Sequence, residues 1–265
     1  MRRDSKASDA APASSNIGLR GGMIAAMRRA SAVSIAVIGI ALLGGFLYWW
    51  QRQSAEEYDP VIDPSSFVPS ITNPYFTLVP GTKYFYESRT TDGVERIEVE
   101  VTGEQKQVLG IPVTVVRDRV YLDDVLVEDT GDWYAQDASG TVWYFGEDVS
   151  NYENGKLKDH AGAWEAGVDG AKPGIVMLAD PKTGDSYRQE YYRGKAEDMA
   201  DVVALEKAVA VPYGSFTDCL QTRDWSKIET TLQEYKYYCP AAGFLVKEEN
   251  MSDSRETAEL VNITK

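Results

Sequence analysis

Large aromatic side chains stand on consecutive positions at several places in this sequence, and they are its strongest candidates for ligand binding. Neighbouring residues of a β-strand point to opposite faces of a sheet, so aromatic pairs in strands place rings on both faces. One of these faces then forms either a second core or a concave groove for an apolar or sugar-like ligand. The candidate groove residues are Trp133, Trp143, Trp164, Tyr191 and Tyr237.

Acidic side chains offer a second kind of chemistry, because a pair of carboxyl groups about 5 to 9 Å apart can hydrolyse a glycosidic bond. Conceivable acids and bases are Glu147, Asp148, Glu165 and Asp169. Spacing along the chain does not fix distances across strands, so no pair is located and no catalytic residue is assigned. A hydrolase acting on an envelope polymer or glycan is therefore an alternative to a binding function.

Metal and nucleophile chemistry find little support. His160 is the single histidine, and it stands beside Lys158 and Asp159 without a G-x-S-x-G motif. Two cysteines and one histidine do not supply four zinc ligands. Asp137 begins the series Asp-x-Ser-x-Thr, which is an incomplete calcium loop and is explained by a turn. We expect no metal and no cofactor.

The two cysteines, Cys219 and Cys239, fall in an expected hairpin formed by residues 216–228 and 232–248. If the turn is centred near Glu229, each cysteine lies ten residues from it and the two face one another. In an oxidising compartment they form a disulfide, which stabilises a loop of this size by about 3 kcal/mol. Two reduced core thiols are the alternative.

The elements that position these residues have a period of two, which predicts antiparallel strands with one buried face. Asp92-Gly93 separates two alternating runs, and residues 137–140 suit a type I turn with glycine in the left-handed position. Residues 195–211 fit a helix or two strands, and their β-branched valines favour strands. The expected strands cover residues 82–90, 94–102, 108–116, 119–127, 132–136, 141–145, 175–178 and 186–192.

Residues 146–174 contain six glycines and scattered apolar side chains. This composition predicts a long loop or lid. Long loops in compact domains are often functional, so we expect a site here.

The N-terminal part predicts a membrane anchor. Residues 31–50 (SAVSIAVIGIALLGGFLYWW) are twenty uncharged residues, which span about 30 Å as a helix. Arg28 and Arg29 precede them, so the N-terminus is expected in the cytoplasm. A cleaved signal peptide is the alternative, but the run is long and ends in bulky aromatics.

The expected organisation is a disordered cytoplasmic tail (1–30), a transmembrane signal-anchor (31–50), an extended proline-rich tether (51–80), an extracytoplasmic, periplasmic or extracellular β domain (81–250) and a C-terminal tail (251–265). The formal net charge is −14, although the first 55 residues hold seven Lys and Arg against two Asp and Glu. The domain is therefore strongly acidic, which argues against binding to nucleic acid.

Several motifs, among them DWYAQDASGTVWYFGED (132–148), GDSYRQEYY (184–192) and EYKYYCPAAGFLVKEE (234–249), resemble a family of uncharacterised bacterial exported proteins. The resemblance covers about residues 68–249 and implies an extracytoplasmic β domain without a known activity. The final strands are also similar to periplasmic domains built as curved half-barrels, some of which carry lipids or lipoproteins.

The sequence thus predicts a mainly β protein, with a twisted antiparallel sheet that can curve into a half-barrel, preceded by one transmembrane helix. The expected function is a non-enzymatic binding or envelope-associated module with an aromatic groove. The alternatives are the hydrolase and a structural partner of a membrane complex.

Overall fold

The computed structural model describes residues 58–231, 233–251 and 256–265. The expected cytoplasmic tail, the anchor at 31–50 and the first part of the tether lie outside the described residues and stay predictions. Within the part of the chain that the structure describes, no helix is long and apolar enough to cross a bilayer. The compact unit considered below contains Asp63–Lys265.

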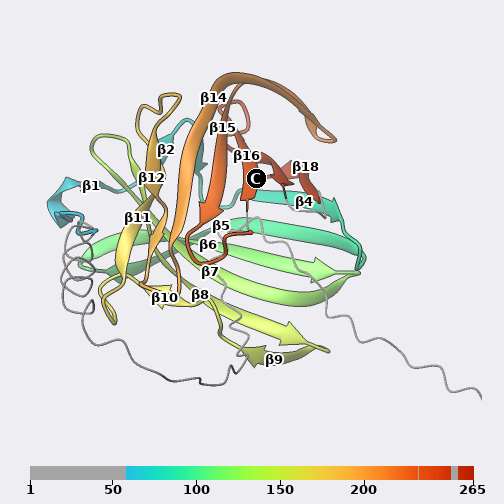
Figure 1. Ribbon diagram of the computed structural model, residues 1–265, viewed down its shortest axis with the longest axis horizontal. Helices are drawn as coiled ribbons and strands as arrows, with labels where there is room; N and C mark the ends of the chain where they lie inside the picture. Colours follow the sequence, from blue (N-terminus) through green and yellow to red (C-terminus); the bar gives the residue numbers. More distant parts are fainter. Residues whose placement is uncertain (1–57, 232, 252–255) are drawn as a thin grey trace, which may run out of the picture. The chain divides into compact units, whose positions relative to one another are not determined.

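Sixteen strands of this unit form one antiparallel sheet (Figure 1). Its path begins with β12 (Ser186–Arg188), β14 (Asp198–Val211), β15 (Gly214–Ser226), β16 (Gln233–Cys239), β17 (Phe244–Asn250) and β18 (Thr257–Thr264). It continues with β4 (Lys83–Arg89), β5 (Val94–Val108), β6 (Ile111–Leu122), β7 (Val125–Asp137), β8 (Val142–Glu153), β11 (Lys172–Met177) and β13 (Glu190–Tyr191). Off this path, β1 (Phe67–Val68) pairs with β7, while β9 (Lys156–Asp159) and β10 (Trp164–Glu165) pair with β8.

The sheet is nearly closed, because its first and last strands are neighbours in the chain. β12 pairs with β14 and β13 pairs with β11, and only Gln189 separates β12 from β13. The backbone N–H of Gln189 also donates to the carbonyl of Asp198 on β14 at 2.8 Å. The mainly β, antiparallel prediction is confirmed, and the sheet curls further than the expected half-barrel.

Two hairpin turns show how local residues set the strand boundaries. Residues 137–140 form the predicted turn, with Gly140 at φ 98° and its N–H bonded to the Asp137 carbonyl at 3.0 Å. Asp123 and Asp124 form a second turn at φ 47° and 66°. Aspartate tolerates this left-handed conformation, so a turn forms without glycine. The expected strand at 119–127 runs across it and is wrong.

The loop or lid expected at 146–174 is also wrong. β8 continues to Glu153, and β9, β10 and the start of β11 occupy much of the remainder. Asn154 and Gly155, at φ 53° and 71°, form the tight turn between β8 and β9. Four of the glycines, Gly155, Gly162, Gly167 and Gly170, lie in turns between short strands, which is why the density of glycines resembles that of a loop.

The boundaries at both ends of the domain need correction. Residues assigned to the tether form the 3-10 turn η1 (Pro64–Ser66), β1 and the hairpin of β2 (Ile71–Asn73) with β3 (Phe76–Leu78). Phe76 is 2% exposed, so this segment belongs to the core. At the other end β18 pairs with β17 and β4, so the expected C-terminal tail contributes a central strand of the sheet.

Residues 195–211 are strand and not helix, as favoured, but most of them form one strand, β14, where two were expected. The expected strand at 232–248 is two strands, β16 and β17, because Gly243 at φ 72° belongs to a turn between them. The disulfide between Cys219 and Cys239 is confirmed. It lies beside the pair Leu220 and Tyr238, in the register that a turn centred at Glu229 requires.

The inner face of the curled sheet holds the core. Tyr86, Ile97, Leu220, Leu245 and Leu260 are fully buried there. Alternation along each strand places them inward, as in β4, where buried and more exposed residues strictly alternate. The interior also buries many charged side chains, which is unusual because such groups are costly to remove from water.

Candidate functional site

An open groove lies on the outer face of the sheet, across β5, β6, β7 and β8. Its volume is about 780 Å³, which is in the range of small-molecule sites. An irregularity of β5 between Val101 and Gln105 forms one wall. We call it the outer groove, and the lining residues that matter below are Glu100, Lys106, Arg117, Asp129, Trp133 and Asp148.

Trp133 forms the aromatic part of the outer groove. Its neighbour in space is Lys106, whose Nζ lies 3.3 Å from the centre of a Trp133 ring. Nζ of Lys106 also donates to Oε2 of Glu165 at 2.7 Å. Trp133 is 6% exposed, so the lysine covers the ring. Because a lysine side chain is flexible and Lys106 reaches the ring from β5, across β6, a ligand can replace it over the indole face.

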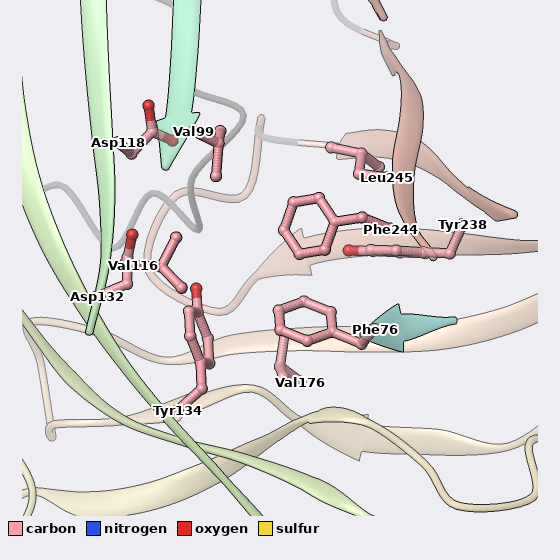
Figure 2. Close-up of a pocket in the computed structure, with 10 residues that line it drawn as sticks. All are labelled: Phe76, Val99, Val116, Asp118, Asp132, Tyr134, Val176, Tyr238, Phe244 and Leu245. Atoms are coloured by element: carbon pink, nitrogen blue, oxygen red, sulfur yellow. The ribbon is translucent and has the colours of Figure 1, made fainter. Parts of the chain in front are cut away.

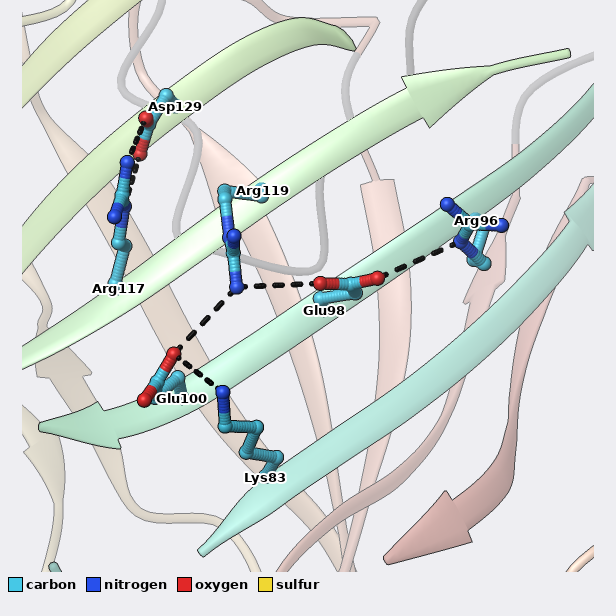
Figure 3. Close-up of polar contacts among 7 residues, drawn as sticks. All are labelled: Lys83, Arg96, Glu98, Glu100, Arg117, Arg119 and Asp129. Carbon is cyan, nitrogen blue, oxygen red and sulfur yellow. Dashed lines mark hydrogen bonds and ion pairs between the residues drawn. The ribbon is translucent and has the colours of Figure 1, made fainter. Parts of the chain in front are cut away.

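Paired charges continue from the outer groove across the same face of the sheet (Figure 3). Arg117 and Asp129 are joined by two hydrogen bonds. Nε of Arg117 donates to Oδ1 of Asp129 at 2.7 Å, and Nη2 donates to Oδ2. Nη2 of Arg119 lies 3.2 Å from Glu98 and 3.5 Å from Glu100, and Nζ of Lys83 lies 2.9 Å from Glu100. These pairs are partly exposed, so they add little stability and remain available to polar ligand groups.

The inner face has a much smaller space (Figure 2). A cavity of about 20 Å³ lies between Phe76, Tyr134 and Phe244, with Asp118 and Asp132 at one side. The rings of Phe76 and Tyr134 meet edge to face with centres 5.1 Å apart, and the rings of Phe76 and Phe244 are tilted with centres 4.8 Å apart. This cavity holds about one water molecule and has no room for a larger ligand.

Four carboxyl groups on β7, β8, β13 and β14 are deeply buried next to this core. Burial raises the pKa of Asp132 to about 7, although the Tyr144 hydroxyl donates to it at 2.7 Å and lowers the pKa. Burial likewise raises the pKa of Asp198 to about 7. For Glu147 and Glu190, burial and then the neighbouring acids raise the pKa well above the usual range. These groups therefore hold protons near neutral pH.

The acids that the sequence offered for hydrolysis do not converge. Glu147 faces the interior, where one of its oxygens has no hydrogen-bond partner among the described residues. Asp148, the next residue, lines the outer groove, and Glu165 is paired with Lys106. Asp169 lies in an exposed turn at φ 50°. Glu147 and Asp148 thus lie on opposite faces of one strand.

The five aromatic candidates occupy separate positions. Trp133 lines the outer groove, whereas Trp164 packs inside against Tyr144, with ring centres 5.4 Å apart. Trp143 donates from Nε1 to Asp137 at 2.8 Å. Tyr191 lies under the guanidinium of Arg188, and the Tyr237 hydroxyl donates to Glu249 at 2.8 Å.

Sequence reasoning missed Lys106, Arg117 and Asp129, which complete the outer groove around Trp133. A signal for Arg117 was present, because β6 repeats Arg117 and Arg119 at a spacing of two, opposite the repeated Glu98 and Glu100 of β5. The contact between Lys106 and Trp133 depends on strand register and the β5 irregularity, which no local pattern reveals.

The remaining candidates have structural roles. Asp137 accepts from the backbone N–H of Ser139 at 2.8 Å and of Thr141 at 3.2 Å, so the turn uses its oxygens. His160 is exposed, with Nδ1 2.6 Å from the Val149 carbonyl oxygen. Across the described ranges, no group of three or more His, Cys, Asp or Glu side chains is arranged to hold a metal ion.

No protein-family model matches this chain. No curated protein matches it in sequence. Among solved structures, one similar chain is described as "a putative lipoprotein from Parabacteroides distasonis". The two chains share 12% sequence identity with a TM-score of 0.40, over 72% of this chain and 98% of that chain.

Proposed function

We propose that this protein is a non-enzymatic, envelope-associated binding module, held by its N-terminal anchor, that binds an uncharged glycan in the outer groove. The observation that carries the proposal is the groove itself, which combines a volume of about 780 Å³ with an aromatic ring and polar groups of both signs. The inner cavity beside Phe76, by contrast, has a volume of about 20 Å³.

The chemistry of the outer groove favours a polyhydroxylated ligand. Arg117 is paired with Asp129, and Lys106 with Glu165, so neither cation is available to hold a strongly anionic group. Sugar hydroxyls both donate and accept, and they can bond to such pairs without separating them. The indole of Trp133 provides an apolar face against which a sugar ring can pack once Lys106 moves aside.

The location outside the cytoplasm is supported by the disulfide. Structural disulfides persist in oxidising compartments and are rare in the cytosol. The bond between Cys219 and Cys239 therefore agrees with the predicted anchor, whose basic flank favours a cytoplasmic N-terminus.

A hydrolase is less well supported by the geometry. Glu147 is the conceivable catalytic acid whose pKa is raised, but it is buried on the inner face. Asp148 and Glu165 lie at or beside the outer groove, and a paired Glu165 is not free to act as a general acid. A binding function needs no pair of catalytic carboxyl groups.

The test is calorimetric titration of the full-length protein in detergent with glycan fragments from the native host's envelope. Asp148→Asn removes a charge-assisted contact in the groove, worth about 1.5–3 kcal/mol, and we expect affinity to fall about tenfold or more. Asp180→Asn, at an exposed aspartate outside the groove, is the matched control and leaves affinity unchanged. Equal affinity of the two variants would show that the ligand binds outside the outer groove. If no fragment bound, the proposal of a glycan ligand would be wrong.

A further inference from the structure

A buried lysine lies among three carboxyl groups on the inner face of the sheet. Lys236 is 3% exposed and stands on β16, between β15 and β17. Its Nζ lies 3.3 Å from Oδ2 of Asp224, 3.5 Å from Oε2 of Glu248 and 3.6 Å from Oε2 of Glu234. All three acids are buried as well.

The strand register explains this approach. Lys236 pairs directly with Glu248 of β17 on one side and with Thr222 of β15 on the other. Asp224 is two residues along β15 from Thr222, so its side chain points to the same face and lies diagonal to the lysine. The pleat therefore holds the amine and the carboxyl group together without a flexible loop.

Such a site is expensive as an ion pair. Moving an ammonium and a carboxylate out of water costs several kcal/mol per ion, and their attraction does not always offset this cost. A covalent amide between the same atoms has no net charge and needs no hydration. Burial also removes the bulk water that would hydrolyse it.

We propose that Lys236 and Asp224 join in an intramolecular isopeptide bond. The ammonium first gives a proton to the carboxyl group, and the lone pair of Nζ then attacks Cγ of Asp224. The new C–N bond forms as one C–O bond breaks, and the departing hydroxyl, which carries the proton already transferred, takes one further proton from Nζ and leaves as water. An ammonium and a carboxylate are thus converted into an amide and one water, without an oxidant or other reagent.

Neighbouring groups are placed to assist both halves of this step. The Thr222 hydroxyl donates to Oδ1 of Asp224 at 2.7 Å, and Nε2 of Gln189 donates to Oδ2 at 3.3 Å. These donors stabilise negative charge on the Asp224 oxygens as the tetrahedral intermediate forms. Glu248 is within proton-transfer reach of Nζ, and burial raises its pKa well above the usual range, so it can hold and return a proton.

The isopeptide bond would be a second covalent link between β15 and β16, which the disulfide already joins. Cys219 and Cys239 connect β15 and β16 near one end of their pairing, and Asp224 and Lys236 would connect them further along. Unlike the disulfide, an amide survives reduction. The proposal is independent of the ligand of the outer groove, which lies on the opposite face.

The test is mass spectrometry of the purified full-length protein after reduction and alkylation. Trypsin does not cut after an acylated lysine, so we expect peptide 224–227 joined to peptide 228–247, at their summed mass less one water molecule. Both peptides free, with cleavage after Lys236, would overturn the proposal. A link from Lys236 to Glu234 or Glu248 instead would overturn the assignment to Asp224.

Variants separate the reaction from the fold. Lys236→Arg retains the charge but cannot form the amide, so peptide 224–227 should appear free. Glu248→Gln keeps the size of the side chain and should leave a larger fraction unlinked if Glu248 relays the proton. If Glu248→Gln were linked as completely as the native protein, Glu248 would have no role in relaying the proton. Circular dichroism checks that each variant folds. Whether Lys236 and Asp224 are linked is decided by the peptides of the native protein alone.

Discussion

The buried acids of the inner face make the folded state hold protons that the unfolded chain releases. The pKa of Asp132 rises from 3.8 to about 7 because burial disfavours its charged form. Between these two values the unfolded chain has lost this proton and the folded chain has kept it. Its contribution to the free energy of unfolding therefore falls as pH rises from about 4 to about 7, and stays constant above that.

Asp132→Asn tests this relation, because asparagine has nearly the same shape and does not ionise. We expect the variant to lose the part of the decline due to Asp132, about 1.4 kcal/mol per pH unit between pH 4 and 7. Chemical denaturation at several pH values measures it. The exposed Asp169→Asn is the control, and its pH profile should match that of the native protein. An unchanged profile in Asp132→Asn would show that Asp132 is ionised in the folded state.

At the scale of elements, turns with a local signature were predictable and those without it were not. Residues 137–140 have an aspartate that accepts from backbone N–H groups and a glycine at positive φ, so their turn was found. Asp123 and Asp124 lack a glycine, and the expected strand continued through them. Asn154-Gly155 has the stronger signature, but the surrounding glycines suggested a loop.

Long-range pairing could not be predicted in the same way. The disulfide was foreseen because both cysteines lie in one hairpin with a defined centre. The closure of the sheet joins β11, β13 and β14, whose register depends on close backbone packing and not on any nearby turn. The outer groove also depends on long-range pairing, since Lys106 of β5 and Trp133 of β7 meet across β6. The candidate site was therefore found only in part, through Trp133, Asp148 and Glu165.

Gly174 is the residue that permits this closure. A Cβ at Gly174 would lie 2.0 Å from the carbonyl oxygen of Gln189, which is backbone and has no free space in which to move. We expect Gly174→Ala to separate β13 from β11 and to lower the free energy of unfolding by about 3 kcal/mol. Gly103→Ala is the matched control, because its Cβ would meet nothing within 4 Å.

Hydrogen exchange locates the effect of Gly174→Ala. The amide of Gln189 should exchange faster in this variant, while amides of β5 and β6 keep their protection. If Gly174→Ala were as stable as Gly103→Ala, the pairing of β11 with β13 would not depend on the close approach of Gly174 to Gln189.

At the scale of the whole molecule, the distribution of lysines provides a test of location. Lys6 is the one lysine before residue 83, and it precedes the predicted anchor. The exposed lysines of the domain include Lys156, Lys158 and Lys182. An anchor with a cytoplasmic N-terminus would put Lys6 on one side of the membrane and these three on the other.

A membrane-impermeant amine reagent applied to sealed, right-side-out spheroplasts should therefore modify the three domain lysines and leave Lys6 unmodified, as read by peptide mass spectrometry. Detergent should then make Lys6 reactive, which shows that the membrane had protected it. Modification of Lys6 with protection of the domain lysines would reverse the proposed topology. Modification of all four in sealed spheroplasts would show that no anchor separates them. The reversed topology would also remove the oxidising compartment that the disulfide and the glycan-binding proposal require.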